Sequence, residues 1–79
     1  MEQAQILQQI NNVFIDILEN DDIKLTRATT AKDIDEWDSL NHIQLVVAIE
    51  KKFKVKFTTG EIYKWNNVGD MVDSILAKQ

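Results

Sequence analysis

The sequence predicts an all-α protein, a bundle of three long helices and one short third helix with a long first loop. Three observations lead to this fold class. Apolar residues recur with the 3.6-residue period of an amphipathic helix near residues 6–18 and again near residues 68–76. Residues 39–53 are apolar almost all the way round, and the chain has no proline to interrupt any segment. We expect a single compact domain over residues 1–79, near the lower size limit for a self-supporting core.

The first long helix is indicated by apolar residues that share one helical face: Ile6, Leu7, Ile10, Val13, Phe14, Ile17 and Leu18. It should end near Glu19, because the "ENDD" that begins there offers turn-forming side chains and no apolar continuation. Residues 20–38 follow no regular pattern, and a loop of that length is uncommon in a compact domain unless it is functional or anchored. Its candidate anchors are Ile23, Leu25, Ile34 and Trp37.

The second long helix should begin at Asp38 or Ser39, because aspartate is a favoured N-cap, and it should run to about Phe53. At about 100° per residue its apolar side chains form two arcs. The broad arc, which we expect to face the core, begins near His42 and holds Leu45, Val46, Ile49 and Phe53. A bundle this small rarely buries two arcs, so we expect part of the narrow arc to meet solvent as a binding surface. The narrow arc holds Leu40, Ile43 and Val47.

Two shorter segments complete the bundle. Lysines alternate with apolar residues in "KVKFTTGE", after which Thr58 or Thr59 can cap a short third helix containing Ile62 and Trp65. Gly69 in the first turn of the last helix lowers helix propensity, and a close contact with another backbone is one reason for it. The last helix, capped by Asn66 or Asn67, has helically spaced apolar residues: Val68, Met71, Val72, Ile75 and Leu76.

Composition narrows the functional classes. The chain has no cysteine, so disulfides and thiolate metal sites are excluded. It shows neither a signal peptide nor an apolar run long enough to span a bilayer, and we expect a cytoplasmic monomer that binds no metal. The net charge of −4 argues against nucleic acid as a partner. Residues 1–38 carry nine acids and three bases, whereas residues 39–79 carry four acids and six bases, so the two halves present different charges.

Ser39 lies at the entrance to the second helix, beside the narrow apolar arc. Unpaired backbone N–H groups and the positive end of the helix dipole favour an anionic group at such a place. A phosphate esterified to Ser39 would therefore be stabilised. From the pattern alone, however, the favoured interpretation is that Asp38 and Ser39 are only a helix cap.

The segment "WDSLNHIQLVVAIEKKF", followed by "VKF" and later by "NNVGDMVDSI", resembles the acyl carrier protein family, whose hallmark is Asp-Ser-Leu at the start of the second of four helices. The resemblance covers nearly the whole chain and implies a four-helix acyl-carrier-type bundle. It also implies that Ser39 receives 4'-phosphopantetheine from coenzyme A through a phosphopantetheinyl transferase. The thiol of that arm would carry acyl groups as thioesters between acyl-loading and acyl-transfer enzymes, and the protein itself would have no catalytic residue.

The resemblance implies roles around the serine and in an acyl cavity. Asp38 and Leu40 match the recognition motif that flanks Ser39. His42 could touch the phosphate of the arm or the cavity mouth, but the interpretation that we favour for it is an ordinary solvated side chain on the helix face. For all cavity positions plain core packing is the alternative, and we favour it for Leu45 and Phe53. The positions that can line the cavity are Leu45, Val46, Ile49, Phe53, Ile62 and Trp65.

The expected partner surface departs from the family in its charge. The resemblance assigns to partner binding Asp35, Glu36, Leu40, Ile43, Val47 and Glu50. The family's second helix is usually strongly acidic, whereas here its far end is basic, with Lys51, Lys52, Lys54 and Lys56. A basic patch on a partner would be repelled by that end, which favours a specialised lipid, polyketide or polysaccharide pathway over general fatty-acid synthesis. Trp37 points the same way, because the family usually has a small or aliphatic residue before "DSL". Trp65 is bulkier than the family's usual aliphatic residue, so it would shorten the cavity and favour short or polar cargo.

Two other functions stay open at this point. A peptidyl or aminoacyl carrier shares the serine and the bundle, but its motif more often has a glycine and a less acidic context, so "DEWDSL" argues against it. An unmodified helical adaptor would bind a partner through Leu40, Ile43 and Val47. A calcium loop in "DIDEWD" is excluded because the required glycine and terminal glutamate are missing.

Overall fold

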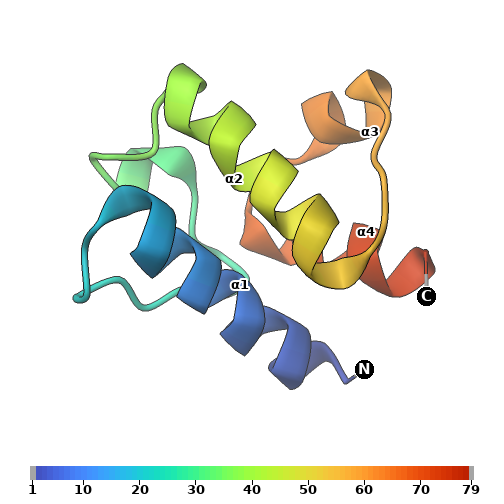
Figure 1. Ribbon diagram of the computed structural model, residues 1–79, viewed down its shortest axis with the longest axis horizontal. Helices are drawn as coiled ribbons and strands as arrows, with labels where there is room; N and C mark the ends of the chain where they lie inside the picture. Colours follow the sequence, from blue (N-terminus) through green and yellow to red (C-terminus); the bar gives the residue numbers. More distant parts are fainter. Residues whose placement is uncertain (1, 79) are drawn as a thin grey trace.

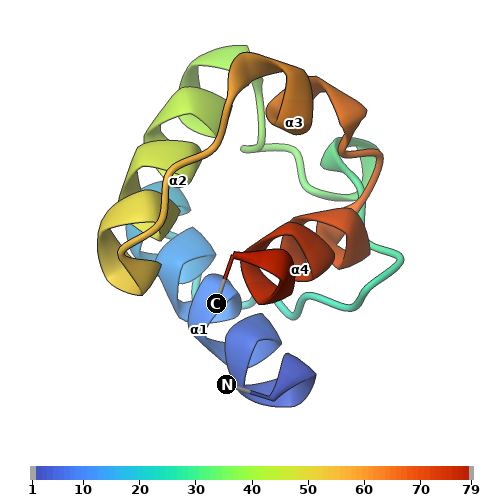
Figure 2. The ribbon, with the colours of Figure 1, turned by 90° about the vertical axis from the view of Figure 1, so that its right-hand side faces the viewer.

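The computed structural model describes residues 2–78, which form helices and loops without a strand. α1 spans Gln3–Leu18, α2 Ser39–Phe53, α3 Thr59–Lys64 and α4 Val68–Ala77, and one turn of 3₁₀-helix, η1, spans Ala31–Asp33. α1 packs against both α2 and α4, whereas the short α3 packs against α4 (Figure 1, Figure 2). The predicted all-α fold, with three long helices, a short third helix and a long first loop, is confirmed.

One apolar core joins the three long helices. Phe14 of α1, Leu45 and Ile49 of α2, and Val72 and Ile75 of α4 have no exposed surface. Each such side chain contributes about 1.5–3 kcal/mol relative to remaining in water, so tertiary packing rather than helix propensity holds these helices together. Phe53 is only half-buried at the edge of this core, and Val46 is buried outside it.

The first loop is anchored as its apolar residues predicted. Ile23, Leu25 and Trp37 are buried, and Ile34 packs against the core. Asn11 of α1 also holds the loop, because its side-chain amide donates to the Ile23 carbonyl at 3.1 Å and its Oδ1 accepts from the Leu25 N–H at 2.6 Å. These anchors compensate for the absence of regular structure over most of the loop.

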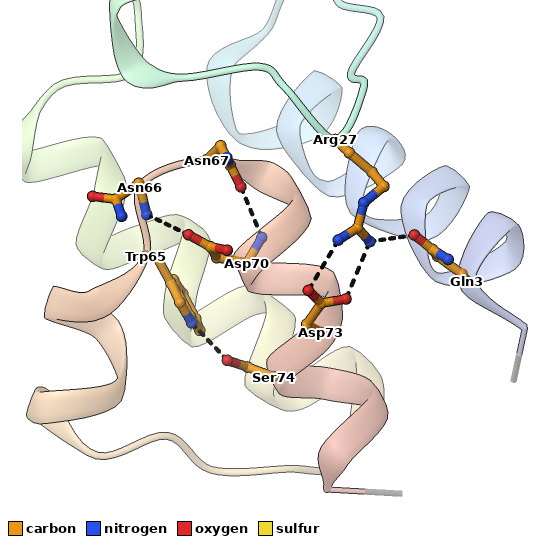
Figure 3. Close-up of polar contacts among 8 residues, drawn as sticks. All are labelled: Gln3, Arg27, Trp65, Asn66, Asn67, Asp70, Asp73 and Ser74. Atoms are coloured by element: carbon orange, nitrogen blue, oxygen red, sulfur yellow. Dashed lines mark hydrogen bonds and ion pairs between the residues drawn. The ribbon is translucent and has the colours of Figure 1, made fainter.

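The start of α4 lies directly against the first loop. The Gly69 N–H donates to the carbonyl oxygen of Arg27 at 2.9 Å, and a Cβ on Gly69 would lie 3.0 Å from that same oxygen. The close backbone contact expected at Gly69 is therefore confirmed. The Arg27 guanidinium pairs with Asp73 of α4 at 2.9 Å and contacts Gln3 of α1, so one side chain ties the loop to two helices (Figure 3).

The helix boundaries follow the predicted caps, with one difference. The side-chain oxygens of Asp38, Thr58 and Asn67 each accept a hydrogen bond from a backbone N–H in the first turn of the helix that follows. α2 ends at Phe53, as expected. α3 ends at Lys64, so Trp65 lies one residue beyond the helix in which it was expected, because the backbone becomes extended there and leads to the α4 cap at Asn67.

Candidate functional site

Ser39 is the first residue of α2, and its side chain is exposed. The helix start is rigid at this point, because Asp38 accepts the N–H of Asn41 on its Oδ1 and the N–H of His42 on its carbonyl, both at 2.8 Å. The Asn41 amide also donates to the Glu36 carbonyl at 2.8 Å. The Ser39 hydroxyl has no hydrogen-bond partner among residues 2–78, so it is free to react while the backbone around it is held.

Ser39 lines an open cleft of about 800 Å³ between α2, α3 and the segment that leads into α4. The cleft walls mix apolar side chains with several polar ones, a composition typical of small-molecule sites. The apolar lining includes Ile43, Ile62, Trp65 and Met71, and the polar lining includes His42, Thr59, Asn66 and Asn67. An organic group attached to Ser39 can therefore lie against carbon and still meet hydrogen-bonding partners.

The cleft contains only two of the residues assigned to the acyl cavity from sequence. Ile62 and Trp65 line it. Val46 and Ile49 are buried and do not line it, because the cleft reaches only the first turn and a half of α2 and these residues lie farther along the helix. Leu45 belongs to the core, in agreement with the packing role favoured for it.

Trp65 forms a fixed wall of the cleft. Its indole Nε1 donates to the Ser74 hydroxyl of α4 at 2.7 Å (Figure 3), and its ring meets the Phe57 ring edge-on at 4.9 Å. Tyr63 on α3, which the sequence reasoning did not single out, also lines the cleft and is 83% exposed. It was missed because α3 is too short for its exposed face to show in a periodicity.

His42 lines the cleft next to Ser39, and the expectation of a solvated side chain on the helix face was wrong. It is half-buried, and its Nδ1 accepts a hydrogen bond at 3.0 Å from the indole Nε1 of Trp37. Trp37 itself is only 9% exposed and packs edge-on against Phe14 at 4.8 Å. Burial lowers the pKa of His42 below its ordinary value, because desolvation disfavours the imidazolium. Trp37 precedes α2, so no helical spacing linked these two residues in the sequence.

The narrow apolar arc of α2 forms an exposed strip beside Ser39, as expected. Leu40 is 68% exposed, Ile43 62% and Val47 43%, and this set is called the α2 strip below. The three acids assigned to partner binding differ in their surroundings. Asp35 is exposed, whereas Glu36 accepts from the Asn20 amide at 3.0 Å and Glu50 accepts from the Phe57 N–H at 2.8 Å. The carboxylates of Glu36 and Glu50 therefore also hold the loops on either side of α2.

A family model described as the phosphopantetheine attachment site matches residues 4–75. The chain belongs to the acyl carrier protein family. An acyl carrier protein of Thermosynechococcus vestitus is 33% identical over 76 residues, which are 95% of this chain and 93% of that protein. One from Rubrobacter xylanophilus is 28% identical over 79 residues, 100% of this chain and 98% of that protein. The solution NMR structure of a holo acyl carrier protein from Geobacter metallireducens has a TM-score of 0.87 and 44% identity, covering 92% of this chain and 84% of that chain.

Acyl carrier proteins are non-catalytic, and their cofactor is 4'-phosphopantetheine, whose thiol holds acyl groups as thioesters. Members of the family interact with phosphopantetheinyl transferases and with acyl-handling enzymes in general. The residues of this acyl carrier protein fit the cofactor, because an exposed serine hydroxyl lies at a helix N-terminus, where a phosphate is stabilised, and beside a cleft. Residues 2–78 include no cluster of histidine and carboxylate side chains placed to hold a metal ion, and no helix among them is long and apolar enough to cross a membrane.

Proposed function

We propose that Ser39 is the attachment point of the arm and that this acyl carrier protein serves a specialised lipid, polyketide or polysaccharide pathway. The observation that carries the first part is the exposed hydroxyl of Ser39 on the rim of the cleft, which has no hydrogen-bond partner among the described residues. In the transfer, Ser39 Oγ attacks the pantetheine-side phosphorus of coenzyme A. The bond from that phosphorus to adenosine 3',5'-bisphosphate breaks, and the hydroxyl proton passes to a base of the transferase. The single negative charge of the phosphodiester is then stabilised at the N-terminus of α2.

The α2 strip is proposed as the docking surface for partner enzymes. Leu40, Ile43 and Val47 present apolar side chains to solvent next to Ser39, so an enzyme that covers them also reaches the arm. Asp35 adds exposed negative charge on the N-terminal side of the strip. A monomer suits this role, because self-association through the strip would exclude the partners.

The cleft supports short or polar cargo rather than a long acyl chain. Trp65 is fixed by Ser74 and Phe57, so it cannot easily turn aside for a longer chain. Asn66, Asn67 and Thr59 offer hydrogen bonds that a plain hydrocarbon would leave unused. Loading a matched series of short, hydroxylated and long-chain acyl groups tests this part, with retention of the thioester in hydroxylamine as the measurement. We expect protection of short or polar groups and little protection of a long chain.

The attachment site is tested by intact mass spectrometry after incubation with coenzyme A, Mg²⁺ and a broad-specificity phosphopantetheinyl transferase. We expect the wild-type chain to gain the mass of one phosphopantetheine group, and Ser39→Ala to gain none. Ser74→Ala is the matched control, because Ser74 is the other serine of the chain and its hydroxyl is engaged by Trp65. An unchanged wild-type mass, or an equal gain in Ser39→Ala, would remove the proposal.

A further inference from the structure

The hydrogen bond between Trp37 and His42 determines which nitrogen of the imidazole carries a proton. An indole N–H can only donate, so the His42 Nδ1 that lies 3.0 Å from it must be unprotonated. A neutral imidazole has one N–H, which is therefore on Nε2. Protonation of Nδ1 would replace this hydrogen bond by two opposing N–H groups.

The core of the protein holds Trp37 in place, and Trp37 in turn orients His42. The Trp37 ring meets the Phe14 ring edge-on, and its backbone N–H donates to the Ile34 carbonyl at 3.1 Å. The planes of the indole and the imidazole are inclined by only 24°, with 6.0 Å between their centroids. The imidazole is thus fixed in both position and tautomer before any ligand enters the cleft.

We propose that His42 is a specificity-determining hydrogen-bond donor of the cleft, whose Nε2–H, set by Trp37, binds an oxygen acceptor of the group attached at Ser39. This inference rests on the proposed attachment at Ser39. Ser39 and His42 are three residues apart on one helix, so their Cβ atoms are neighbours, about 5–6 Å apart. The acceptor belongs either to the arm, as a phosphate or amide oxygen, or to the cargo, as its thioester or hydroxyl oxygen. Both sources have the same chemistry.

A neutral His42 side chain holds the arm less strongly than an imidazolium cation would. Burial lowers the pKa of His42, so the free protein presents an imidazole and not an imidazolium at neutral pH. The other titratable groups that line the cleft are Asp38 and Tyr63. A hydrogen bond from neutral His42 orients the arm without the ion pair that an imidazolium would form with its phosphate, and that ion pair would oppose release of the arm to a partner enzyme.

The proposal is tested by nitrogen NMR of protein labelled with ¹⁵N-histidine in three forms: unmodified, carrying the arm, and carrying the arm with a short hydroxyacyl group. In the unmodified protein we expect a protonated Nε2 and an unprotonated Nδ1. We expect the Nε2 signal to shift on attachment of the arm if the acceptor is in the arm, and only on acylation if it is in the cargo. A protonated Nδ1 in the unmodified protein, or an Nε2 signal unchanged in all three forms, would overturn the proposal.

Trp37→Phe is the matched variant, because phenylalanine keeps an aromatic ring beside Phe14 and removes the N–H. We expect this variant to show a mixture of tautomers, a higher His42 pKa and a smaller Nε2 shift on modification. Mass spectrometry on the same samples separates the two proposals. Absence of the arm from Ser39 contradicts the proposed function, whereas an attached arm with an unresponsive imidazole contradicts the role of His42 alone.

Discussion

Gly69 shows how a single residue joins the first loop to α4. The Gly69 N–H donates to the carbonyl oxygen of Arg27, and a Cβ on Gly69 would lie against that same oxygen. Arg27 cannot easily move away, because its guanidinium is held by Asp73 and Gln3. The cost of a glycine in a helix, about 1 kcal/mol, is offset here by a contact that another residue would obstruct.

Gly69→Ala should lower the free energy of unfolding by about 1 kcal/mol, because the steric overlap with the Arg27 carbonyl exceeds the gain in helix propensity. The measurement is urea denaturation followed by circular dichroism. Gly60→Ala is the control, since the nearest atom to its new Cβ would be 3.9 Å away, and it should stabilise the protein by about 0.5–1 kcal/mol. Equal stabilisation by both substitutions would show that the first loop can move away from a side chain at position 69.

α2 carries opposite charges at its two ends. Asp38 caps its N-terminus, and Lys51 and Lys52 lie in its last turn. Both arrangements complement the helix dipole, each by about 0.3–1 kcal/mol. Because the α2 strip lies between the two ends, an enzyme that docks on it meets negative charge at one end of the helix and positive charge at the other. A partner with a uniformly basic docking surface is attracted by one end and repelled by the other.

Replacing Lys51, Lys52 or both with glutamate should raise the rate of acyl loading by an enzyme with a basic docking patch, by about tenfold in the double variant at low ionic strength. The rate is measured with the arm already attached, and the gain should fall as salt is added. Lys24→Glu, an equal charge change in the first loop, is the control for each single variant and should have little effect. Equal rates for all variants would mean that the basic end of α2 does not select partners.

Across the whole molecule, the lowered pKa values of two acids and of the histidine all predict that the free energy of unfolding falls toward acidic pH. Arg27 lowers the pKa of Asp73, and the Thr58 N–H together with Lys78 lowers that of Glu61. Burial lowers the pKa of His42. When a group has a lower pKa in the folded state, the unfolded chain binds more protons than the folded protein does. The stability that this group contributes to the fold is therefore present at higher pH and is lost as the pH falls.

The free energy of unfolding should therefore fall as the pH is lowered from 7 to about 3. The contribution of His42 to stability is lost first, from near its ordinary pKa of 6.5 downward. The contributions of Glu61 and Asp73 are lost at lower pH, from near their ordinary pKa values of 4.5 and 3.8. Urea denaturation at a series of pH values measures the profile. In His42→Gln, which keeps a group able to accept from Trp37, the decline between pH 7 and 5 should be reduced. A profile that is flat or rises toward acid would contradict the assigned shifts.

Spacing along the chain was enough to predict the helices and the exposed α2 strip. The core faces of α1 and α4 and the caps at Asp38, Thr58 and Asn67 follow from local rules, because helical period and capping depend on residues a few positions apart. The same local rules made Ser39 a candidate, since it lies at a helix start and beside an apolar arc. They favoured a plain helix cap, and the resemblance of the surrounding sequence to the acyl carrier protein family pointed to the attachment site instead.

The tertiary structure decided how far the cleft extends and which other segments line it. The resemblance to the acyl carrier protein family assigned Ile62 and Trp65 to the cavity, and both line the cleft, but it also assigned Val46 and Ile49, which do not. The cleft lies near the N-terminal end of α2 and draws Tyr63, Asn66 and Asn67 from other segments. The contact of Trp37 with His42 and that of Gly69 with Arg27 likewise join a loop to a helix. Which side chains meet at such a junction depends on how the helices cross and how the loop passes over them. Packing of the whole molecule sets this geometry, and the periodicity of one segment carries no information about it.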